Sequence, residues 1–229
     1  MVLNAIALCK SFGEGPEAIP VLQDVSFSTG EGEFLAITGP SGSGKSTLLG
    51  LLAGLERPTS GEVWLGSHRL DSLDDGAIAR LRRREVGFVF QTFNLVQVLS
   101  IEENVALPFL LDGRPRREWV ERVRAALQTV GLQHRAEHYP EQVSVGERQR
   151  TAIARVLAAR PRVLFADEPT GSLDSERGAA MLDLLRGAAN LGCTVVMVTH
   201  DPMAAGRADR RLHLRDGRLE PSARRAEAC

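Results

Sequence analysis

Apolar residues recur along the chain in short continuous runs, which alternate with segments whose apolar positions follow helical spacing. Short runs rich in Val, Ile and Phe that end at Gly, Pro or polar clusters are typical of β-strands. This pattern predicts strands at residues 2–9, 21–27, 34–38, 62–65, 86–90, 163–166 and 194–199. A turn-rich break over residues 10–16 separates the first two strands.

Helical spacing and capping residues predict helices between these strands. Asp74 can cap a short helix that ends in an arginine run at residues 80–84, for which a solvated helix face is favoured over a phosphate or partner contact. Ser100 and Glu103 form a capping box for a helix that Pro108 ends. Further helices are predicted at residues 45–53, 116–130, 144–159 and 176–190.

The order of these elements indicates the fold class. Strands that alternate with helices are typical of a doubly wound α/β core with a parallel sheet. From residue 92 to about 144 the chain is helical only, which predicts a helical insert within a sheet protein. Asp216-Gly217 predicts a hairpin turn, and the tail after Pro221 has too little apolar content to be expected to fold.

Composition narrows the class of protein. The chain has 229 residues, enough for a core with a subdomain, and its net charge is −1 from 28 Lys+Arg and 29 Asp+Glu. This balance produces no global field that attracts nucleic acid, so we expect no nucleic-acid partner. We find no signal peptide or membrane-length apolar run, and the three cysteines lack metal-ligand spacing. We therefore expect a soluble chain with reduced thiols in a cytoplasm, with Cys9 and Cys193 in the core.

The most specific motif follows the apolar strand at residues 34–38. It fits the P-loop pattern G-x-x-x-x-G-K-S/T, in which backbone N–H groups and a helix N-terminus cradle phosphate groups. Its residues are Gly39, Pro40, Ser41, Gly42, Ser43, Gly44, Lys45, Ser46 and Thr47. In P-loop geometry Lys45 reaches the β and γ phosphates and the Ser46 hydroxyl holds Mg²⁺. The predicted ligand is a nucleoside triphosphate.

Three further strand ends carry polar residues. They are Gln91, Asp167-Glu168 and His200. Each has an ordinary structural alternative, such as a surface glutamine or a structural histidine. Because ligands of open α/β sheets bind at the carboxyl ends of the strands, these side chains can converge on one nucleotide.

Together these motifs resemble the ATP-binding subunits of ABC transporters from about residue 8 to residue 219. The matching stretches are the P-loop, Gln91 after 86–90, the signature-like residues 143–150, Asp167-Glu168, Ser172-Leu173-Asp174 and Thr199-His200-Asp201. Residues 91–95, 103–108 and 167–171 resemble the lipoprotein-release and macrolide-export (LolD/MacB-type) branch. The resemblance implies one ATP-binding domain. Its core is 1–91 and 150–220, with an N-terminal antiparallel β subdomain, a helical insert with the signature at 92–149, and a flexible tail at 221–229.

The resemblance also implies roles for single residues. Phe12 occupies the position that stacks on adenine, although a core phenylalanine is the structural alternative. Asp167 would hold Mg²⁺ through water, and Glu168 would act as general base toward the attacking water. Gln91 would sense metal and water, and His200 would contact the γ-phosphate.

A dimer and a membrane partner follow from the same resemblance. Ser144 and Gly146 of the signature would close over the ATP of a second subunit, and Asp174 lies in the loop that faces this subunit. We expect a homodimer bound to a separate permease at the cytoplasmic face of the inner (plasma) membrane. A soluble ABC ATPase that acts on DNA or ribosomes is disfavoured, because such proteins tend to carry long coiled-coil insertions or two fused cassettes.

Two positions depart from the family pattern. Val145 stands where the signature usually has Gly, at a helix N-terminus close to the opposite phosphate, and its β-branched side chain adds bulk there. This leaves an alternative function open: a nucleotide-gated regulatory clamp that dimerises with ATP but hydrolyses it slowly. Our hypothesis is that Val145 tunes activity without abolishing it. Gln97 stands where the branch often has Pro, so the identity of the permease stays open.

Overall fold

Parallel strands form the central sheet of the structure, a computed structural model that describes residues 1–90, 94–171 and 174–220. The order of the strands is β10-β9-β3-β8-β7-β6, and all neighbours are parallel except the β9–β10 hairpin. Their bounds are β3 Phe34–Thr38, β6 Val86–Phe90, β7 Val163–Asp167, β8 Thr194–Val198, β9 Arg210–Arg215 and β10 Arg218–Leu219. The predicted parallel α/β core is confirmed.

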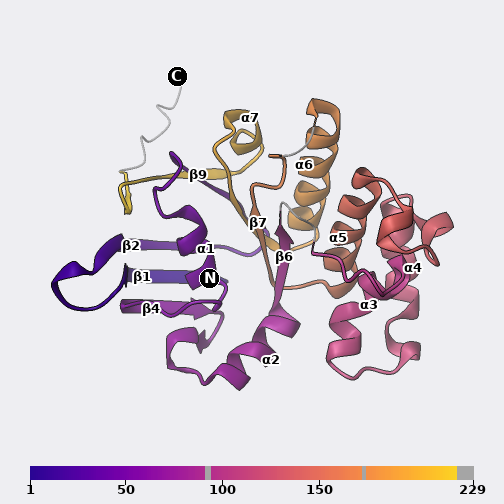
Figure 1. Ribbon diagram of the computed structural model, residues 1–229, viewed down its shortest axis with the longest axis horizontal. Coiled ribbons are helices and arrows are strands. Elements are labelled where there is room, and N and C mark those ends of the chain that lie inside the picture. The colour runs from indigo at the N-terminus through magenta and orange to yellow at the C-terminus, as the bar shows by residue number, and fades with distance from the viewer. Residues whose placement is uncertain (91–93, 172–173, 221–229) are drawn as a thin grey trace.

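A second, antiparallel sheet lies beside the first (Figure 1). Its order is β2-β1-β4-β5, with β1 Leu3–Phe12, β2 Ile19–Thr29, β4 Ser60–Leu65 and β5 His68–Arg69. This confirms the N-terminal antiparallel sheet. The predicted break at residues 10–16 was placed too early, because pairing of Lys10, Ser11 and Phe12 with β2 extends β1 to Phe12.

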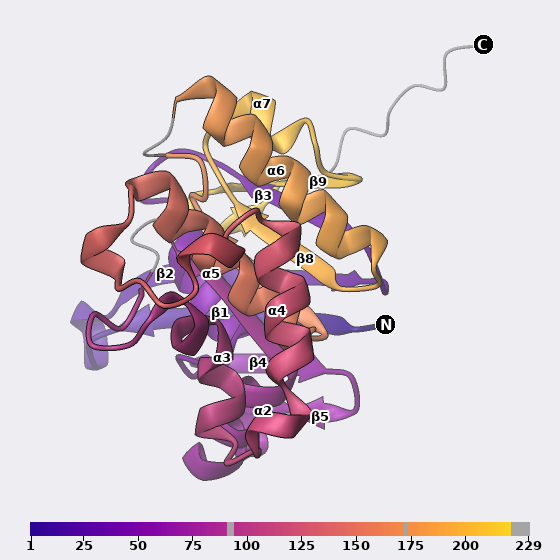
Figure 2. The ribbon, with the colours of Figure 1, turned by 90° about the vertical axis from the view of Figure 1, so that its right-hand side faces the viewer.

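Helices cover both faces of the central sheet, and two of them pack on a third helix instead of on the sheet (Figure 2). The α-helices are α1 Lys45–Leu52, α2 Asp75–Glu85, α3 Ile101–Leu111, α4 Val120–Thr129, α5 Val145–Ala159, α6 Ser175–Asn190 and α7 Pro202–Ala205. Short 3₁₀ turns lie at Gly15–Glu17, Leu70–Ser72, Arg116–Glu118, Gln133–Arg135 and Pro140–Gln142. Because α3 and α4 pack on α5, they form the helical part expected from the sequence.

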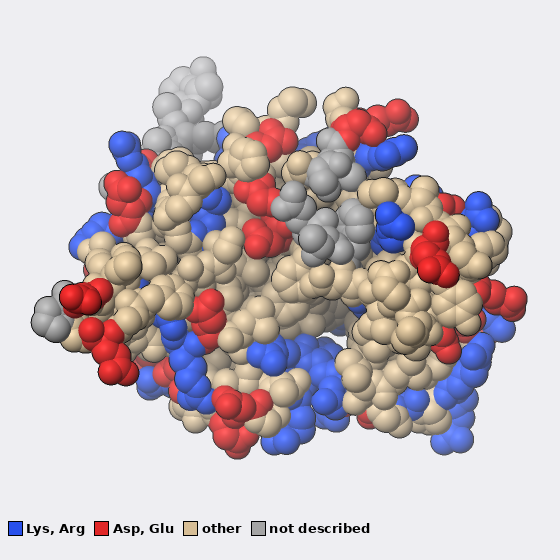
Figure 3. Space-filling view, in the orientation of Figure 1, with Lys and Arg blue, Asp and Glu red and all other residues tan. Residues whose placement is uncertain are grey.

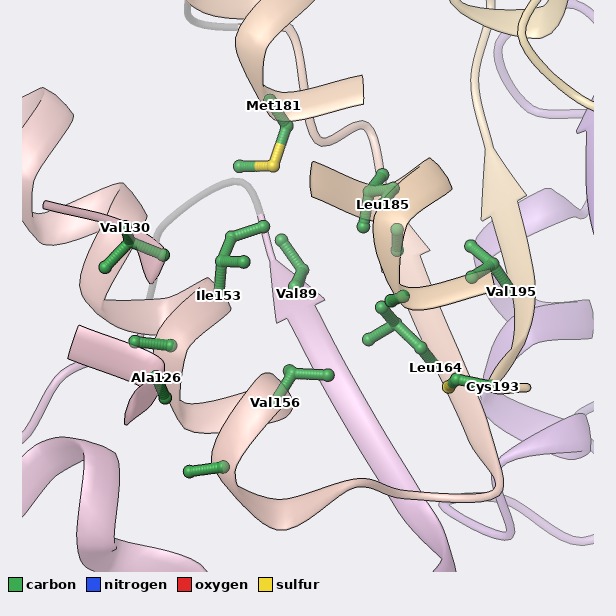
Figure 4. Packing of buried hydrophobic residues seen from close by; sticks show 14 of the residues in the cluster. Val89, Ala126, Val130, Ile153, Val156, Leu164, Met181, Leu185, Cys193 and Val195 are labelled. Atoms are coloured by element: carbon green, nitrogen blue, oxygen red, sulfur yellow. The ribbon is translucent and has the colours of Figure 1, made fainter. Parts of the chain in front are cut away.

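Alternating side chains of the central strands divide the core in two. In β3, Leu35 and Ile37 pack in the cluster that contains α1 and the antiparallel sheet. Phe34 and Ala36 belong to the opposite cluster, which α3 to α6 complete. Figure 4 shows Ile153 of α5 facing Val89 of β6 within this second cluster. The strands β3, β7 and β8 are buried on both faces, which explains why they read as continuous apolar runs.

The helices α2 and α3 begin directly after the capping residues predicted for them, Asp74 and Ser100. The Asp74 carboxylate accepts a hydrogen bond from the Ala77 N–H at 2.8 Å, and Ser100 and Glu103 form the predicted capping box. In the predicted hairpin turn, Asp216 and Gly217 have φ values of 47° and 75°. These left-handed values match the turn that joins tight β-hairpins.

Two predicted helix boundaries were wrong. Pro108 does not end its helix but lies inside α3, which continues to Leu111. The helix continues because Phe109, only 4% exposed, packs in the core, so tertiary packing outweighs the lost N–H of Pro108. The helix predicted at 116–130 begins as a 3₁₀ turn over Arg116–Glu118, and α4 starts at Val120.

The described residues include two cysteines, and they differ in burial. Cys193 is buried, and burial raises the pKa of its thiol to about 12, as expected of a core residue. Cys9 is only half-buried. Among the residues that the structure describes, we find no helix long and apolar enough to cross a bilayer.

Candidate active site

The P-loop joins β3 to α1 at the carboxyl end of the central sheet. Gly39, Gly42 and Gly44 have φ values of 153°, 79° and 98°. An ideal Cβ on Gly39 would lie 2.1 Å from the Leu214 carbonyl oxygen, and one on Gly44 would lie 2.9 Å from the Val21 carbonyl oxygen. At these two positions the loop runs so close to neighbouring backbone that a side chain does not fit.

Polar groups of the loop are arranged around the start of α1. The Lys45 ammonium donates hydrogen bonds to the carbonyl oxygens of Gly39 at 3.0 Å and Pro40 at 2.8 Å. The Ser43 hydroxyl is buried and has no hydrogen-bond partner within the described residues. Pro40, Ser41 and Ser46 are exposed, and Thr47 is half-buried. Such a loop can bind an anion, because free N–H groups and the positive end of the helix dipole meet there.

The Ser46 hydroxyl lies near the Asp167 carboxylate at the end of β7 and favours its charged form. Burial raises the pKa of Asp167, and the nearby Glu168 adds to this, whereas Ser46 and Lys45 oppose it. Hydroxyl and carboxylate oxygens are hard donors that suit Mg²⁺. Over residues 1–90, 94–171 and 174–220 we find no cluster of three acidic, His or Cys side chains that could hold a metal alone. The donor set therefore fits Mg²⁺ that is also bound by phosphate oxygens.

Glu168 and His200 are in direct contact. The distance between Glu168 Oε1 and His200 Nδ1 is 2.8 Å, and the Thr199 hydroxyl donates to Glu168 Oε2 at 3.3 Å. The Glu168 backbone is left-handed, with φ 46°, and its N–H bonds the Val198 carbonyl at 3.0 Å. The structure thus orients both oxygen atoms of the carboxylate that was predicted to be the general base.

The signature residues form the start of α5. The Ser144 hydroxyl accepts from the Glu147 N–H, and the Glu147 carboxylate accepts from the Ser144 N–H at 2.8 Å and from Arg135 at 3.0 Å. Gly146 is buried, whereas the Val145 side chain is exposed. Within the described part of the chain, no hydrogen bond or ion pair joins Ser144 or Gly146 to the P-loop. The structure therefore does not bring the signature residues and the P-loop together within one copy.

Asp174 caps the start of α6, as Ser144 caps the start of α5. Its carboxylate accepts from the Arg177 N–H at 2.9 Å. Between the signature and the site, the buried Gln149 donates to the Pro169 carbonyl at 3.4 Å, so α5 is tied to the loop that follows Glu168.

The charge of Glu147 is expected to stabilise the fold. The hydrogen bond from Ser144, helped by Arg135, lowers the pKa of Glu147 from 4.5 to about 2. The folded state therefore binds this proton more weakly, so the stabilisation is present above pH 4.5 and is lost as the pH falls toward about 2. We expect Glu147→Gln to lower the free energy of unfolding by about 1 kcal/mol near neutral pH, after allowance for solvent screening.

Urea unfolding at pH values between about 7 and 3 measures this effect. The difference between wild type and Glu147→Gln should shrink as the pH falls. Glu121→Gln is the matched control, because the Glu121 side chain is 78% exposed and its ion-pair partner among the described residues is Arg124 on the same helix. A difference that stays constant with pH would show that the Glu147 carboxylate does not contribute through its charge.

Phe12 lies at the end of β1 and is 45% exposed, so the core alternative was wrong. The Lys10 ammonium lies 4.9 Å from the centre of its ring. Lys10 thus covers part of the aromatic surface, and we did not identify this neighbour from the sequence. Its position two residues before Phe12 in a strand, on the same face, was the available signal. Gln91, predicted to bind metal and water, lies outside the described residues, as do Ser172 and Leu173.

The chain is similar to known proteins over nearly its whole length. The sequence profile of the family described as ABC transporter matches residues 22–171. The uncharacterized ABC transporter ATP-binding protein MJ1508 of Methanocaldococcus jannaschii is 43% identical over 218 residues, which are 95% of this chain and 97% of that protein. The uncharacterized ABC transporter ATP-binding protein YvrO of Bacillus subtilis is 43% identical over 224 residues, 96% of this chain and 95% of YvrO.

Solved structures show the same fold. The ATP-binding cassette MJ0796, solved as a dimer in a post-hydrolysis state with ADP and Pi, superposes with a TM-score of 0.85 at 40% identity, covering 96% of this chain and 97% of that one. The Clostridium perfringens protein cbiO1, part of the ABC transporter complex cbiONQ, has a TM-score of 0.85 at 29% identity, covering 96% and 87%.

Proposed function

Because the chain belongs to the family of ABC transporter ATP-binding subunits, we propose that it hydrolyses ATP as a homodimer and powers a separate membrane permease. As a cassette ATPase of this family it uses ATP with Mg²⁺. The observation that carries the proposal is the convergence of Lys45, Ser46, Asp167, Glu168 and His200 at the carboxyl ends of three neighbouring strands.

The chemistry proposed for these residues follows from their contacts. Lys45 and the N–H groups of the P-loop would bind the β and γ phosphates. Ser46, and Asp167 through water, would hold Mg²⁺, whose charge would offset that of the phosphates. Glu168 takes the proton of the attacking water. It can do so once it exchanges its hydrogen bond to His200, which then donates to the γ-phosphate. Phe12 would stack on adenine, and Gln91 would sense metal and water, as the family resemblance implies.

The proposed dimer completes each site with residues of the other copy. Ser144 and Gly146 would bind the γ-phosphate held by the partner, and Asp174 would face it. The dimeric structures of MJ0796 support this arrangement, since they are similar to this chain over nearly its whole length. ATP would then act as both substrate and bridge, and its hydrolysis would let the two copies separate.

A groove beside residue 94 supports contact with a permease. The groove has a volume of about 400 Å³ and lies between β6 and α3. Phe88, Phe90 and Leu111 contribute apolar surface, Arg82 and Arg83 contribute positive charge, and none of the described lining residues is acidic. Lys and Arg side chains gather beside the hollow in Figure 3. Such a surface fits a protein segment that is apolar with acidic flanks. We place the chain at the cytoplasmic face of the inner (plasma) membrane through this contact.

The transported substrate is proposed from the branch resemblance. The sequence stretches at residues 91–95, 103–108 and 167–171 favour export or membrane extraction of a lipoprotein, lipid or drug-like molecule. The choice of substrate itself would lie in the permease.

Mg²⁺-ATP turnover by the purified chain, measured as a function of protein concentration, tests the proposal. We expect turnover per subunit to rise with concentration, because each site needs residues from a second copy, and to vanish in the Glu168→Gln blank. Turnover that is independent of concentration down to the nanomolar range would contradict a hydrolysing dimer that forms with ATP.

The regulatory clamp stays an alternative because both Glu168 oxygens are engaged and Val145 is 44% exposed at the start of α5. A clamp would dimerise with ATP but show little turnover at any concentration. Sedimentation of the same samples with Mg²⁺-ATP therefore separates the two functions.

A further inference from the structure

A guanidinium group lies beside the signature, on the neighbouring helix α6. Arg177 Nε is 3.4 Å from Asp174 Oδ2 and 3.9 Å from the position that an ideal Cβ on Gly146 would occupy. The Arg177 side chain is 62% exposed. Among the described residues, its two terminal nitrogen atoms have no hydrogen-bond partner. Arg177 therefore has donors available next to the signature.

Among the described residues, the nearby carboxylates accept no hydrogen bond from the terminal nitrogen atoms of Arg177. Asp174 accepts from the backbone N–H of Arg177 and pairs with its Nε. Glu147 is engaged by Ser144 and Arg135. Glu176 lies in the first turn of α6, and Arg150 places a second guanidinium 3.9 Å from the same Cβ position on Gly146. A small cavity of about 60 Å³ lies between α5 and α6 and is lined by both Arg150 and Arg177. Arg177 therefore has room to change its rotamer.

The start of α5 is where the proposed dimer brings the partner's γ-phosphate. Val145 is β-branched and 44% exposed there, so it restricts close approach of a phosphate to the backbone. A guanidinium group can bind a phosphate without close approach of the backbone, because it lies at the end of a long side chain. It binds phosphate oxygens in a bidentate manner.

We propose that Arg177 donates from its terminal nitrogen atoms to the γ-phosphate of the ATP bound by the second copy, where it replaces the backbone contact that Val145 hinders. The inference rests on the proposed homodimer. It makes Arg177 a nucleotide-binding residue of the composite site, with a triphosphate as its ligand. The contact forms only across the dimer, since Arg177 has no contact with the P-loop of its own copy among the described residues.

ATP-dependent dimerisation in a Glu168→Gln background tests this role, because hydrolysis is then blocked. We expect Arg177→Gln to raise the dimer dissociation constant in Mg²⁺-ATP by on the order of ten- to a hundred-fold, the equivalent of one charge-assisted hydrogen bond. Binding of ATP to the monomer should not change. Arg124→Gln is the matched control on an exposed helix face, and thermal unfolding of each variant checks that it is folded.

A second substitution separates a phosphate contact from a structural effect. If Arg177 compensates for Val145, then Val145→Gly should reduce the loss caused by Arg177→Gln, and Arg177→Lys should recover part of the affinity. Equal dimerisation of Arg177→Gln and its parent would overturn the role of Arg177 alone. So would an equal loss in both the Val145 and the Val145→Gly backgrounds. A parent that does not dimerise with ATP would overturn the proposed dimer together with this inference.

Discussion

Glu168→Gln is expected to lower Mg²⁺-ATP turnover by about 10²- to 10⁴-fold, the usual contribution of a general base. Glu168 follows the last residue of β7, Asp167, and its carboxylate is oriented by His200 at 2.8 Å and Thr199 at 3.3 Å. Glutamine has nearly the same shape and keeps hydrogen bonds to both neighbours, but it does not take a proton. Substrate binding should therefore remain, because the P-loop is unchanged.

Single-turnover kinetics and ATP binding, measured on the same preparation, separate these effects. Glu118→Gln is a suitable control, since Glu118 is exposed and lies in the 3₁₀ turn before α4. Full turnover by Glu168→Gln would show that another group accepts the proton. Loss of ATP binding would show that Glu168 is needed for the shape of the site and not for chemistry.

Gly39→Ala should weaken ATP binding by on the order of ten- to a hundred-fold, which corresponds to the loss of about one charge-assisted hydrogen bond. Its new Cβ would lie 2.1 Å from the Leu214 carbonyl oxygen and 2.9 Å from the Ser43 hydroxyl. The loop must then move away from β9, which misaligns its N–H groups. We expect the free energy of unfolding to fall by about 1–3 kcal/mol, as in other overpacked sites.

Gly42→Ala is the matched control for this prediction. Gly42 is also left-handed, with φ 79°, but an added Cβ would have no atom within 4 Å. Gly42→Ala should lower the free energy of unfolding only by the strain of an alanine in the left-handed conformation, about 1–2 kcal/mol. Titration calorimetry with ATP and urea unfolding of both variants measure the difference. Equal ATP affinity of the two variants would show that the contact between Gly39 and Leu214 is not needed for the loop.

Much of this site could be predicted because the signals are local in the chain. A P-loop is one strand end, one turn and one helix start, so the residues from Gly39 to Thr47 show it by themselves. The capping box of Ser100 and Glu103 spans a single helical turn for the same reason. The core strands are readable because burial on both faces leaves continuous apolar runs.

Contacts between distant segments could not be predicted in this way. Glu168 and His200 are separated by 32 residues, and their hydrogen bond depends on the parallel pairing of β7 with β8. The exposure of Phe12 likewise depends on which distant segments cover the end of β1, whereas its contact with Lys10, two residues earlier in the same strand, is local. The sequence does not indicate a function for Arg177, which is a single exposed arginine. Only the packing of α6 beside α5 places it next to Gly146.

By itself, the sequence determined most strands and helices, the phosphate loop and the polar strand ends, because each depends on residues close together in the chain. It did not predict the short β5 and α7 or the strands β9 and β10, of which only the turn between the last two was expected. The tertiary structure decided that α3 continues past Pro108, that Phe12 is exposed beside Lys10, and that His200 holds Glu168. The physical reason is that local propensities amount to a few tenths of a kcal/mol to about 3 kcal/mol. Burial and long-range pairing, summed over many contacts, outweigh them and set which distant side chains meet.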